Sequence, residues 1–344
     1  MAKKKVLAAL SGGVDSSVMA ALLLKEGYDV IGAHMLLLPG EQAQQGNRDA
    51  QRVADELNIP FHSLDCRQPF AESIMADFCQ EYRIGHTPNP CVRCNQQFKF
   101  GYLLQVADAL GVDFLATGHY ARIDHCGELS RLCRGEDPHK DQSYFLFTLN
   151  QQQLGRVLFP LGTLSKPEVR NLAESFHLSS QAKSESQDIC FVTDNDYIRF
   201  LEQQGEWPCH GEICHVNGQV LGHHHGSHRY TIGQRKGLGI GWSEPLYVVA
   251  IDAAQQKVIV GEKPNLACSN LQVRDVVWSV PQQVENLRVD CRIRYRHHQA
   301  MATLNLGPQG RVEVVFDEPQ YGVTPGQCAV FYQDNCVLGG GWIM

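Results

Sequence analysis

The sequence of 344 residues predicts an α/β protein with a parallel-sheet N-terminal domain, a small central β-rich domain and a C-terminal β-barrel. Apolar and amphipathic segments alternate through the first half, and a loop of glycine and serine separates the first strand from the first helix. After residue 210, short apolar segments alternate with turns of glycine, proline and asparagine. The first pattern is typical of a parallel sheet covered by helices, and the last of a barrel. We expect domains at 1–200, 201–264 and 265–344.

Hydrophobic periodicity places the elements of the first half. Strands are expected at 6–10, 30–36, 61–65 and 113–117, and helices at about 14–26, 50–57, 70–83, 99–110, 166–176 and 195–204. Ligands of a parallel sheet bind where its strands end. The loop at 11–17, Met35 on the second strand and Gly118-His119 after the fourth strand would therefore gather at one edge of the sheet.

The part of the chain after residue 210 is expected to form short strands, at 219–221, 247–251, 257–260, 289–295, 311–316 and 327–332. The segment 292–298 alternates like a strand and interleaves a tyrosine with arginines and histidines. It is compatible equally with a basic nucleic-acid-binding patch and with a solvated basic strand, and the net charge of −7 argues weakly against a nucleic-acid partner. The run His223–His225, with His228 nearby, predicts a solvated turn, because no cysteine or acid spacing completes a metal site.

Composition argues against a membrane protein and against a disulfide scaffold. No apolar run approaches the roughly 20 residues that a membrane span needs, and the N-terminus leads into a strand without a signal sequence. We therefore expect a cytoplasmic protein without a membrane partner. The thirteen cysteines are an odd number in a long chain without a secretion signal, which favours reduced thiols. Ten of them, including Cys133 and Cys336, have no motif around them.

The loop Ser11–Ser17, with the sequence Ser-Gly-Gly-Val-Asp-Ser-Ser, follows the first expected strand and opens the first expected helix. A glycine pair allows a tight turn that exposes backbone N–H groups, and the helix N-terminus behind it favours an anion. Asp15 beside such an anion site suggests a bound Mg²⁺. The loop is not a Walker A motif, because no Gly-Lys-Ser/Thr follows. It predicts a phosphate cradle.

Two cysteines stand in contexts that suggest chemistry. Cys94 follows the proline-rich stretch Thr87-Pro-Asn-Pro-Cys91, which is expected to be an extended loop. Arg93 and Lys99 are close enough in sequence to stabilise a thiolate there. Cys190 lies two residues after Asp188, a carboxylate that could act on a proton or a metal.

Six motifs in the same order resemble the bacterial tRNA-specific 2-thiouridylases, a family of PP-loop ATP pyrophosphatases with an adenine nucleotide alpha hydrolase-like N-terminal domain. The likeness extends to two short matches near the C-terminus and covers essentially the whole chain. The matching segments are Ser11–Ser17, Asn89–Asn95, Ala116–Arg122, Lys140–Tyr144, Ser186–Phe191, Tyr230–Gly239, Arg294–Arg296 and Thr324–Gln327.

This resemblance implies an ATP-dependent tRNA-uridine 2-sulfurtransferase. The 2-oxygen of the wobble uridine, position 34, would attack the α-phosphate, and sulfur would then displace AMP. Cys190 matches the persulfide carrier and Cys94 the nucleophile, with Asp15 also in the catalytic set. The two cysteines would end as a disulfide that must be reduced before the next turnover. The positions implied for ATP and Mg²⁺ are Ala9, Leu10, Ser11, Gly12, Gly13, Val14, Asp15, Ser16, Met35 and Gly118.

The resemblance also implies partners. The substrate would be tRNA, with the isoacceptors for Lys, Glu and Gln expected, and the sulfur donor a cysteine desulfurase or a sulfur-relay protein. The three residues of the loop before Cys94 would contact the flipped target base, and polar or cationic groups elsewhere would contact the rest of the tRNA. These positions are Asn89, Pro90, Cys91, His119, Lys140, Asp141, Gln142, Arg294, Tyr295 and Gln327.

The chain departs from the family at Cys91, where the family usually has aspartate, and its loop at 39–47 is shorter than usual. Cys91, Cys94 and Cys190 could hold an iron–sulfur cluster whose free iron binds the transferred sulfide, so a cluster-dependent thiolation stays open. Two further alternatives are a PP-loop amidating ligase and a non-catalytic RNA-binding protein. The first leaves both cysteines without a role, and the second is disfavoured by the presence of Asp15 and both cysteines.

Overall fold

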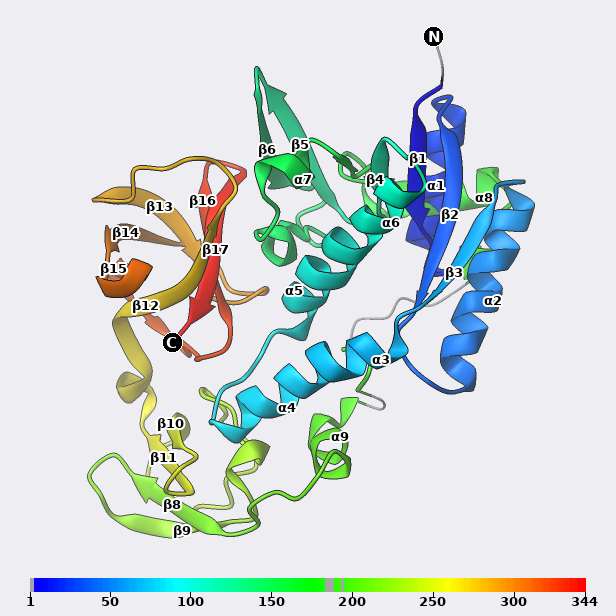
Figure 1. Ribbon diagram of the computed structural model, residues 1–344. Helices are drawn as coiled ribbons and strands as arrows, with labels where there is room; N and C mark the ends of the chain where they lie inside the picture. Colours follow the sequence, from blue (N-terminus) through cyan, green and yellow to red (C-terminus); the bar gives the residue numbers. More distant parts are fainter. Residues whose placement is uncertain (1–2, 183–188, 193–194) are drawn as a thin grey trace.

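The computed structural model describes residues 3–182, 189–192 and 195–344 (Figure 1). Its strands are β1 (Lys5–Ala9), β2 (Asp29–Leu36), β3 (Phe61–Asp65), β4 (Phe114–Ala116), β5 (Ala121–Cys126), β6 (Leu129–Arg134), β7 (Val157–Leu158), β8 (Gly211–His215), β9 (Val220–His224), β10 (Tyr247–Asp252), β11 (Lys257–Gly261), β12 (Ala267–Trp278), β13 (Leu287–Arg292), β14 (Ala300–Leu306), β15 (Val312–Tyr321), β16 (Cys328–Gln333) and β17 (Cys336–Ile343).

The α-helices are α1 (Val14–Lys25), α2 (Glu41–Glu56), α3 (Arg67–Phe70), α4 (Ala76–Arg83), α5 (Pro90–Cys94), α6 (Leu103–Ala109), α7 (Gln151–Leu154), α8 (Lys166–Ser175) and α9 (Tyr197–Gln203). Two π-helical segments, η1 (Ala71–Met75) and η2 (Asn95–Tyr102), join α3 to α4 and α5 to α6. The 3-10 turns are η3 (Ser143–Leu146), η4 (Ser179–Ala182), η6 (Ser227–Arg229), η7 (Lys263–Leu266) and η8 (Pro308–Gly310).

The N-terminal domain is built on a parallel five-stranded sheet in the order β3-β2-β1-β4-β7. Helices α1, α2 and α8 pack on one face in a core that includes Val18, Val53 and Val169, and η2 and α6 pack on the other. The connection from β1 leads to β2 on one side, and β4 lies on the other side. The loop after β1 therefore sits where the strand order reverses, which is the usual ligand site of an open α/β sheet.

The C-terminal domain is a closed antiparallel barrel of six strands, in the order β12-β15-β14-β13-β16-β17. The long strand β12 closes it, pairing with β15 through its first half and with β17 through its second. The central sheet, β10-β11-β8-β9, forms a separate small unit (Figure 1). The predicted fold class, a parallel-sheet domain followed by β-rich domains and a barrel, is confirmed; the exact domain boundaries stay a prediction.

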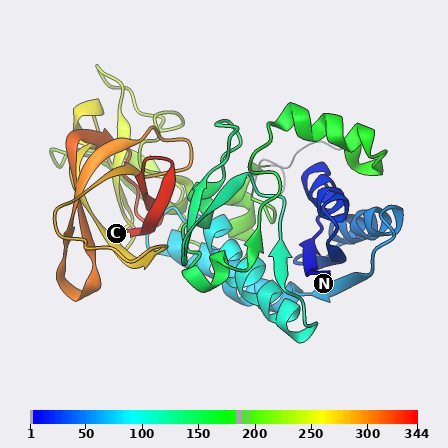
Figure 2. The same cartoon turned by 90° about the horizontal axis from the view of Figure 1, so that it is seen from above.

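The hairpin β5–β6, which periodicity did not predict, joins the N-terminal domain to the barrel. It extends the barrel sheet beyond β17 and lies between the two domains (Figure 2). One hydrophobic cluster runs from Leu7 of the parallel sheet through Leu132 of the hairpin to Tyr332 and Trp342 of the barrel. Because this cluster is shared, the barrel is held against the N-terminal domain by a common core.

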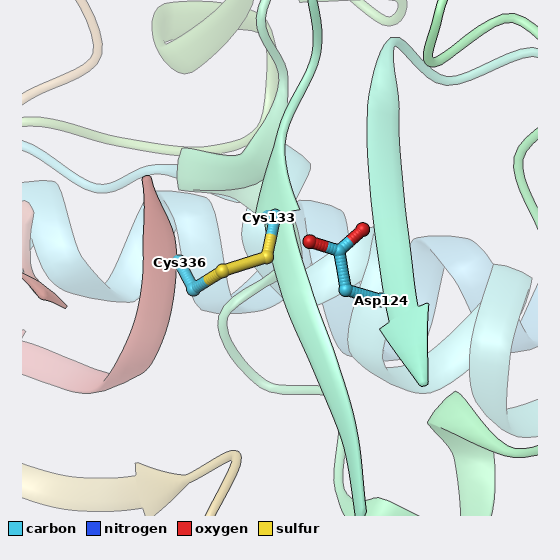
Figure 3. Close-up of side chains that lie close together, drawn as sticks. All are labelled: Asp124, Cys133 and Cys336. Atoms are coloured by element: carbon cyan, nitrogen blue, oxygen red, sulfur yellow. A yellow bond between two sulfur atoms is a disulfide. The ribbon is translucent and has the colours of Figure 1, made fainter. Parts of the chain in front are cut away.

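A disulfide between Cys133 on β6 and Cys336 on β17 crosses this junction, with the carboxylate of Asp124 beside it (Figure 3). The expectation of reduced thiols is therefore wrong for this pair. The two cysteines are 203 residues apart in sequence and face each other only because the hairpin pairs with the barrel. The number and spacing of cysteines in the sequence do not predict which distant strands pair, so they cannot predict this disulfide.

Replacing Cys336 by serine is expected to lower the free energy of unfolding by about 2–4 kcal/mol under oxidising conditions, because the cross-link closes a long loop in the unfolded chain. Chemical denaturation of the wild type and of Cys336→Ser, each with and without a dithiol reductant, measures this. The difference should vanish in reductant. A Cys336→Ser protein as stable as the oxidised wild type would contradict the expectation.

Two local expectations are also corrected. The strand expected at 289–295 ends at Arg292, and the following residues form a turn rather than an alternating strand. The histidine run is solvated only in part: His223 and His225 are exposed, but His224 is buried at the end of β9, where it shares a hydrogen bond with the carbonyl of Gln256, and His228 is buried as well. In the part of the chain that the structure describes, no helix is long and apolar enough to cross a membrane.

Candidate active site

The loop after β1 forms the cradle that its sequence predicts. Gly13 is the N-cap of α1 and makes no side-chain cap, which leaves the first N–H groups of the helix without an intrahelical partner. Serine hydroxyls tighten the turn: Ser16 and Ser17 both donate to the carbonyl of Gly13, at 3.0 and 2.9 Å. The positive end of a twelve-residue helix and an open turn together suit a phosphate group.

Two glycines allow this loop to pack closely. Gly12 has a φ of +73°, and a Cβ there would lie 2.8 Å from the Cβ of Asp49 on α2. A Cβ on Gly118, after β4, would lie 3.1 Å from the backbone of Asp15 and Ser16. The ends of β1 and β4 therefore meet at the loop, as their places in the sheet require. Met35, half-buried near the end of β2, belongs to the same edge.

Asp15 is held by two residues that sequence reasoning missed. Its Oδ1 accepts hydrogen bonds from Lys166 Nζ at 2.6 Å and from the Tyr120 hydroxyl at 2.8 Å. Lys166 begins α8, and its side chain is almost entirely buried. A buried ammonium group next to the cradle adds positive charge where phosphate oxygens would lie. No local motif marks Lys166 as functional; only the packing of α8 against α1 brings it there.

Cys94 lies at the end of α5, where the helix continues into the π-helical segment η2. Such segments occur frequently at functional sites. Burial raises the pKa of the Cys94 thiol to about 11, and it raises the pKa of Cys91 as well. Lys99, on η2, opposes this effect on both thiols through its charge. The predicted role of Lys99 in favouring a thiolate therefore agrees with its position.

Cys190 lies near Cys94 and Lys99, and the packing of its neighbour Phe191 holds it there. That ring packs against Phe70, Phe78 and Phe200, with ring centroids 5.0 to 5.9 Å apart. Burial of the sulfur, followed by the charges of Cys94 and Cys91, raises the pKa of Cys190 to about 12, although the residue keeps an exposed surface. Lys99 again lowers it. The three thiols and Lys99 thus lie within electrostatic reach of one another, and Asp188 lies outside the described residues.

Alkylation of Cys94 is expected to be slow at pH 8 and to rise with pH up to a midpoint near 11. The thiolate is the reactive form, and a pKa raised from 9.0 to about 11 leaves roughly a hundredfold less thiolate at pH 8. Iodoacetamide labelling from pH 7 to 11, read by mass spectrometry for each cysteine, tests this. Lys99→Met should move the midpoint higher. A midpoint at or below pH 9 would contradict the expectation.

Lys99 also contacts His119. Its Nζ lies 3.3 Å from His119 Nε2, and the other ring nitrogen lies 2.7 Å from the hydroxyl of Thr117. Burial, reinforced by the nearby charge of Lys99, holds the pKa of His119 well below its usual range, so the ring is neutral. The ring can then accept from Lys99 through Nε2. Lys99 therefore links the thiol site to the end of β4.

Arg93 does not serve the thiols as predicted. Its guanidinium lies 3.9 Å from Asp77 and stacks 3.8 Å from the ring of Trp342 in the barrel. Consecutive residues of a helix differ by about 100° around its axis, so Arg93 faces the barrel while Cys94 is buried in the N-terminal domain. It anchors α5 to the barrel instead.

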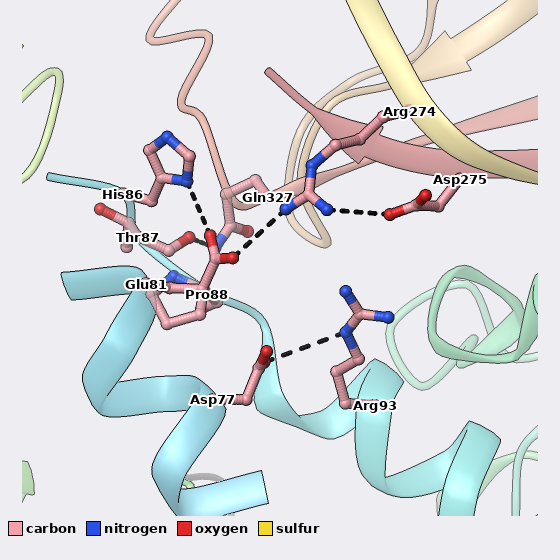
Figure 4. Close-up of polar contacts among 9 residues, drawn as sticks. All are labelled: Asp77, Glu81, His86, Thr87, Pro88, Arg93, Arg274, Asp275 and Gln327. Carbon is pink, nitrogen blue, oxygen red and sulfur yellow. Dashed lines mark hydrogen bonds and ion pairs between the residues drawn. The ribbon is translucent and has the colours of Figure 1, made fainter. Parts of the chain in front are cut away.

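The barrel also holds the loop before Cys94 (Figure 4). Gln327 donates from Nε2 to the carbonyls of Thr87 and Pro88, at 2.8 and 3.3 Å. Beneath them, Glu81 on α4 accepts from Arg274 of β12 at 3.2 Å and lies 2.7 Å from His86. These contacts fix the path of the chain into α5. Gln327 is predicted to contact tRNA, but in this structure its amide group donates to the backbone of the loop before α5.

The other positions expected to contact tRNA have mixed surroundings. Asp141 is buried and accepts from two backbone N–H groups and from Arg292, and Gln142 exchanges hydrogen bonds with the backbone of Tyr120. Arg294 is exposed and Tyr295 packs on Phe145. The structure brings the segments of Lys140 and Tyr295 together on one side of the hairpin. Whether they bind tRNA stays a prediction.

The three thiols are not spaced as ligands of a single metal ion. Among the described residues, Asp124, Cys133 and Cys336 are the one group of three candidate ligand atoms that lie within 4.8 Å of one another. Cys91, Cys94 and Cys190 do not meet that spacing, although they share an electrostatic neighbourhood. The cysteines around an iron–sulfur cluster bind different iron atoms and lie farther apart than the ligands of a single ion. The arrangement of the three thiols therefore excludes a site for a single metal ion and does not test a cluster.

The sheet, the loop at its reversal point and the two appended β units define a nucleotide-binding α/β protein, in which three thiols lie near one lysine. Family models match three consecutive parts of the chain: a tRNA methyl transferase HUP domain at residues 4–194, a tRNA methyl transferase PRC-barrel domain at 198–262, and an aminomethyltransferase beta-barrel domain at 268–343.

Curated relatives make the assignment specific. The protein named tRNA-specific 2-thiouridylase MnmA from Syntrophotalea carbinolica is 54% identical over 99% of this chain and 98% of its own length. The protein of the same name from Geobacter metallireducens is 51% identical over 99% and 97%. This chain belongs to the tRNA-specific 2-thiouridylase family.

Solved structures resemble the chain more distantly. The U34-tRNA thiolase NcsA from Methanococcus maripaludis, solved with its 4Fe-4S cluster, is 20% identical, with a TM-score of 0.37 over 58% of this chain and 64% of its own. This likeness is too distant to bear on the chemistry of the thiol site.

Proposed function

We propose that the protein catalyses the ATP-dependent 2-thiolation of the wobble uridine of tRNA. The observation that carries the proposal is the pair Cys94 and Cys190, which lie around one lysine in a chain whose first loop is a phosphate cradle. Its relatives bear the name of this activity. The nucleotide site would activate the uracil oxygen by adenylation, and the thiol pair would supply the sulfur. Both steps of the proposed reaction therefore have residues that can perform them.

In the first step the cradle binds the phosphates of ATP. The N–H groups at the start of α1 and the ammonium group of Lys166 stabilise the charge that builds on the leaving pyrophosphate. Asp15 is the carboxylate that would hold a magnesium ion brought with the nucleotide, and such an ion neutralises phosphate charge. The uracil 2-oxygen bonds to the α-phosphorus, the bond to pyrophosphate breaks, and the N3 proton is released. Carbon 2 then carries AMP as a leaving group.

In the second step Cys190 delivers sulfur. The terminal sulfur of its persulfide attacks carbon 2 and AMP leaves, which joins Cys190 to the base through two sulfur atoms. The Cys94 thiolate, which burial disfavours and the charge of Lys99 partly offsets, then attacks the Cys190 sulfur. The 2-thiouridine is released and a Cys94–Cys190 disulfide remains. A dithiol reductant returns both thiols by supplying two electrons.

The partners follow from these steps. The persulfide requires a donor of sulfane sulfur, for which a cysteine desulfurase or a relay protein is suited, and the tRNAs for Lys, Glu and Gln are the expected substrates. Asn89 is the N-cap of α5, and Pro90 and Cys91 are its first residues; we expect these three to contact the flipped base. We propose that the protein acts in the cytoplasm, where tRNA is modified.

Mass spectrometry of nucleosides tests the proposal. Wild-type protein is incubated with an unmodified wobble-uridine tRNA, a cysteine desulfurase with cysteine, and either ATP or a non-cleavable ATP analogue. We expect 2-thiouridine at position 34 with ATP and none with the analogue. Thiolation that needs no α–β phosphate cleavage would overturn the adenylation step, and absence of 2-thiouridine with ATP would overturn the function.

A further inference from the structure

A cavity of about 400 Å³ lies between the hairpin β5–β6 and the barrel, outside the nucleotide and thiol sites. Its walls come from the two hairpin strands, from the loop after β6, from the end of β13 and from the turn that follows it. A turn replaces the end of the expected strand, and its residues His297 and His298 line this cavity, whereas Arg294 and Arg296 do not. The cationic and imidazole side chains of the lining are Arg122, Arg134, Arg292, His297 and His298.

Two of the three arginines are already neutralised by carboxylates. Arg122 pairs with Glu136 at 2.7 Å, and Arg292 pairs with the buried Asp141 at 3.3 Å. Arg134 is different: none of the ion pairs among the described residues includes it. Its Nη1 donates to Gln299 at 2.8 Å, and its guanidinium carbon lies 4.2 Å from the centre of the Tyr332 ring.

The remaining donors of Arg134 are unsatisfied. Its Nε and Nη2 are buried and have no hydrogen-bond partner, and the same is true of Nδ1 of His297 in the cavity wall. A buried donor without an acceptor costs about 1–3 kcal/mol, and more when it is charged. An unsatisfied buried group in a native structure calls for a specific explanation, and an ion that supplies the missing acceptor is one of them. A guanidinium fork without an acid partner suits an oxyanion with several acceptor oxygens.

We propose that this cavity, centred on Arg134, binds one backbone phosphodiester of the tRNA substrate. The proposal rests on the proposed function. The cavity adjoins both segments expected to touch tRNA, since Asp141 is in its wall and Tyr295 lies two residues before His297. It is larger than a phosphate group alone, which leaves room for an adjoining ribose. Nε and Nη2 of Arg134 are buried in this structure, so binding requires the side chain to rotate until these donors face the phosphate.

Placed between the domains, such a contact positions the tRNA relative to both. The hairpin side of the cavity is connected to the nucleotide loop by hydrogen bonds. Gln142, next to Asp141 in the cavity wall, accepts from the backbone of Tyr120, and the Tyr120 hydroxyl donates to Asp15. The barrel side carries Arg292 and His297. A phosphodiester held by both sides would fix the distance between the anticodon backbone and the thiol site. Arg134 is therefore assigned a positioning role, not a catalytic one.

The experiment measures tRNA affinity as a function of salt for wild type, Arg134→Gln, Arg134→Lys and Arg131→Gln. Arg131 is exposed on the same strand outside the cavity, so its variant removes an equal charge as a matched control. We expect Arg134→Gln to weaken binding about tenfold and to reduce the slope of log affinity against log salt by about one. Arg134→Lys should recover the slope but not the full affinity, because it keeps the charge and loses the fork.

Fold and function are monitored on the same samples. Thermal unfolding must show that Arg134→Gln is folded; if it is not, the comparison of Arg134→Lys with wild type carries the test. If Arg134→Gln binds tRNA with the same affinity and salt slope as Arg131→Gln, the phosphate site is wrong. Thiolation by the wild type in the same experiment would still support the proposed function. A wild type that neither binds nor thiolates tRNA would overturn the function itself. If inorganic phosphate displaces tRNA at micromolar concentration, the cavity is a site for a free anion, and the proposal of a phosphodiester site is wrong.

Discussion

Replacing Cys190 by serine is expected to abolish 2-thiolation while adenylation of the tRNA continues. Serine cannot carry a persulfide, so sulfur transfer loses its only covalent carrier in the proposed reaction, and activity should fall to the limit of detection. The nucleotide loop is a separate part of the fold, and its geometry does not depend on residue 190. Transfer of label from α-³²P-ATP to tRNA, with 2-thiouridine measured in parallel, separates the two steps.

The matched control is Cys209→Ser, which removes an exposed free thiol outside the site. It should retain both steps. Cys94→Ser should allow a persulfide to form on Cys190 but should stall release of the product. Thiolation retained by Cys190→Ser would show that another cysteine carries the sulfur, and loss of adenylation in that variant would show that the two sites are not separable.

Replacing Lys166 by methionine is expected to reduce adenylation by about 10²–10³-fold, the usual effect of removing one charged group that stabilises a developing negative charge. The substitution also leaves Asp15 with one hydrogen bond, from Tyr120, instead of two. Single-turnover formation of labelled tRNA from α-³²P-ATP measures the effect.

Lys25→Met serves as the control for Lys166→Met, because Lys25 is an exposed lysine at the far end of α1. Its rate should stay within about twofold of the wild type, as is usual for surface substitutions. Binding of tRNA should be unchanged in both variants. If Lys166→Met adenylates tRNA at the rate of Lys25→Met, the buried lysine only braces the loop and takes no part in stabilising phosphate charge.

The features that could be predicted from sequence are those encoded locally. The loop Ser11–Ser17 can be predicted because strand, glycine pair and helix follow one another directly. The alternation of strands and helices predicts the parallel sheet. Lys99 could be named because it lies five residues after Cys94. In each case the residues that matter are neighbours along the chain, so spacing alone predicts their relation.

The features that could not be predicted depend on contacts between distant segments. Lys166 reaches Asp15 across 151 residues, and Cys133 reaches Cys336 across 203. The hairpin β5–β6 has a largely polar outer strand, Ala121–Cys126, so it shows no strong alternation before the barrel pairs with it. Proximity in sequence predicts that Arg93 acts on the thiols, whereas in the fold it contacts the ring of Trp342, which is 249 residues away along the chain.

The most direct test of the central claim is a single-turnover reaction with protein purified anaerobically, loaded with persulfide and mixed with ATP, magnesium and wobble-uridine tRNA. Iron, AMP, pyrophosphate and 2-thiouridine are quantified in the same sample. We predict one 2-thiouridine, one AMP and one pyrophosphate per persulfide, in protein that contains no iron, with Cys94 and Cys190 joined by a disulfide at the end. Thiolation that tracks the iron and acid-labile sulfide content and disappears on chelation would contradict the persulfide route and assign Cys91, Cys94 and Cys190 to a cluster.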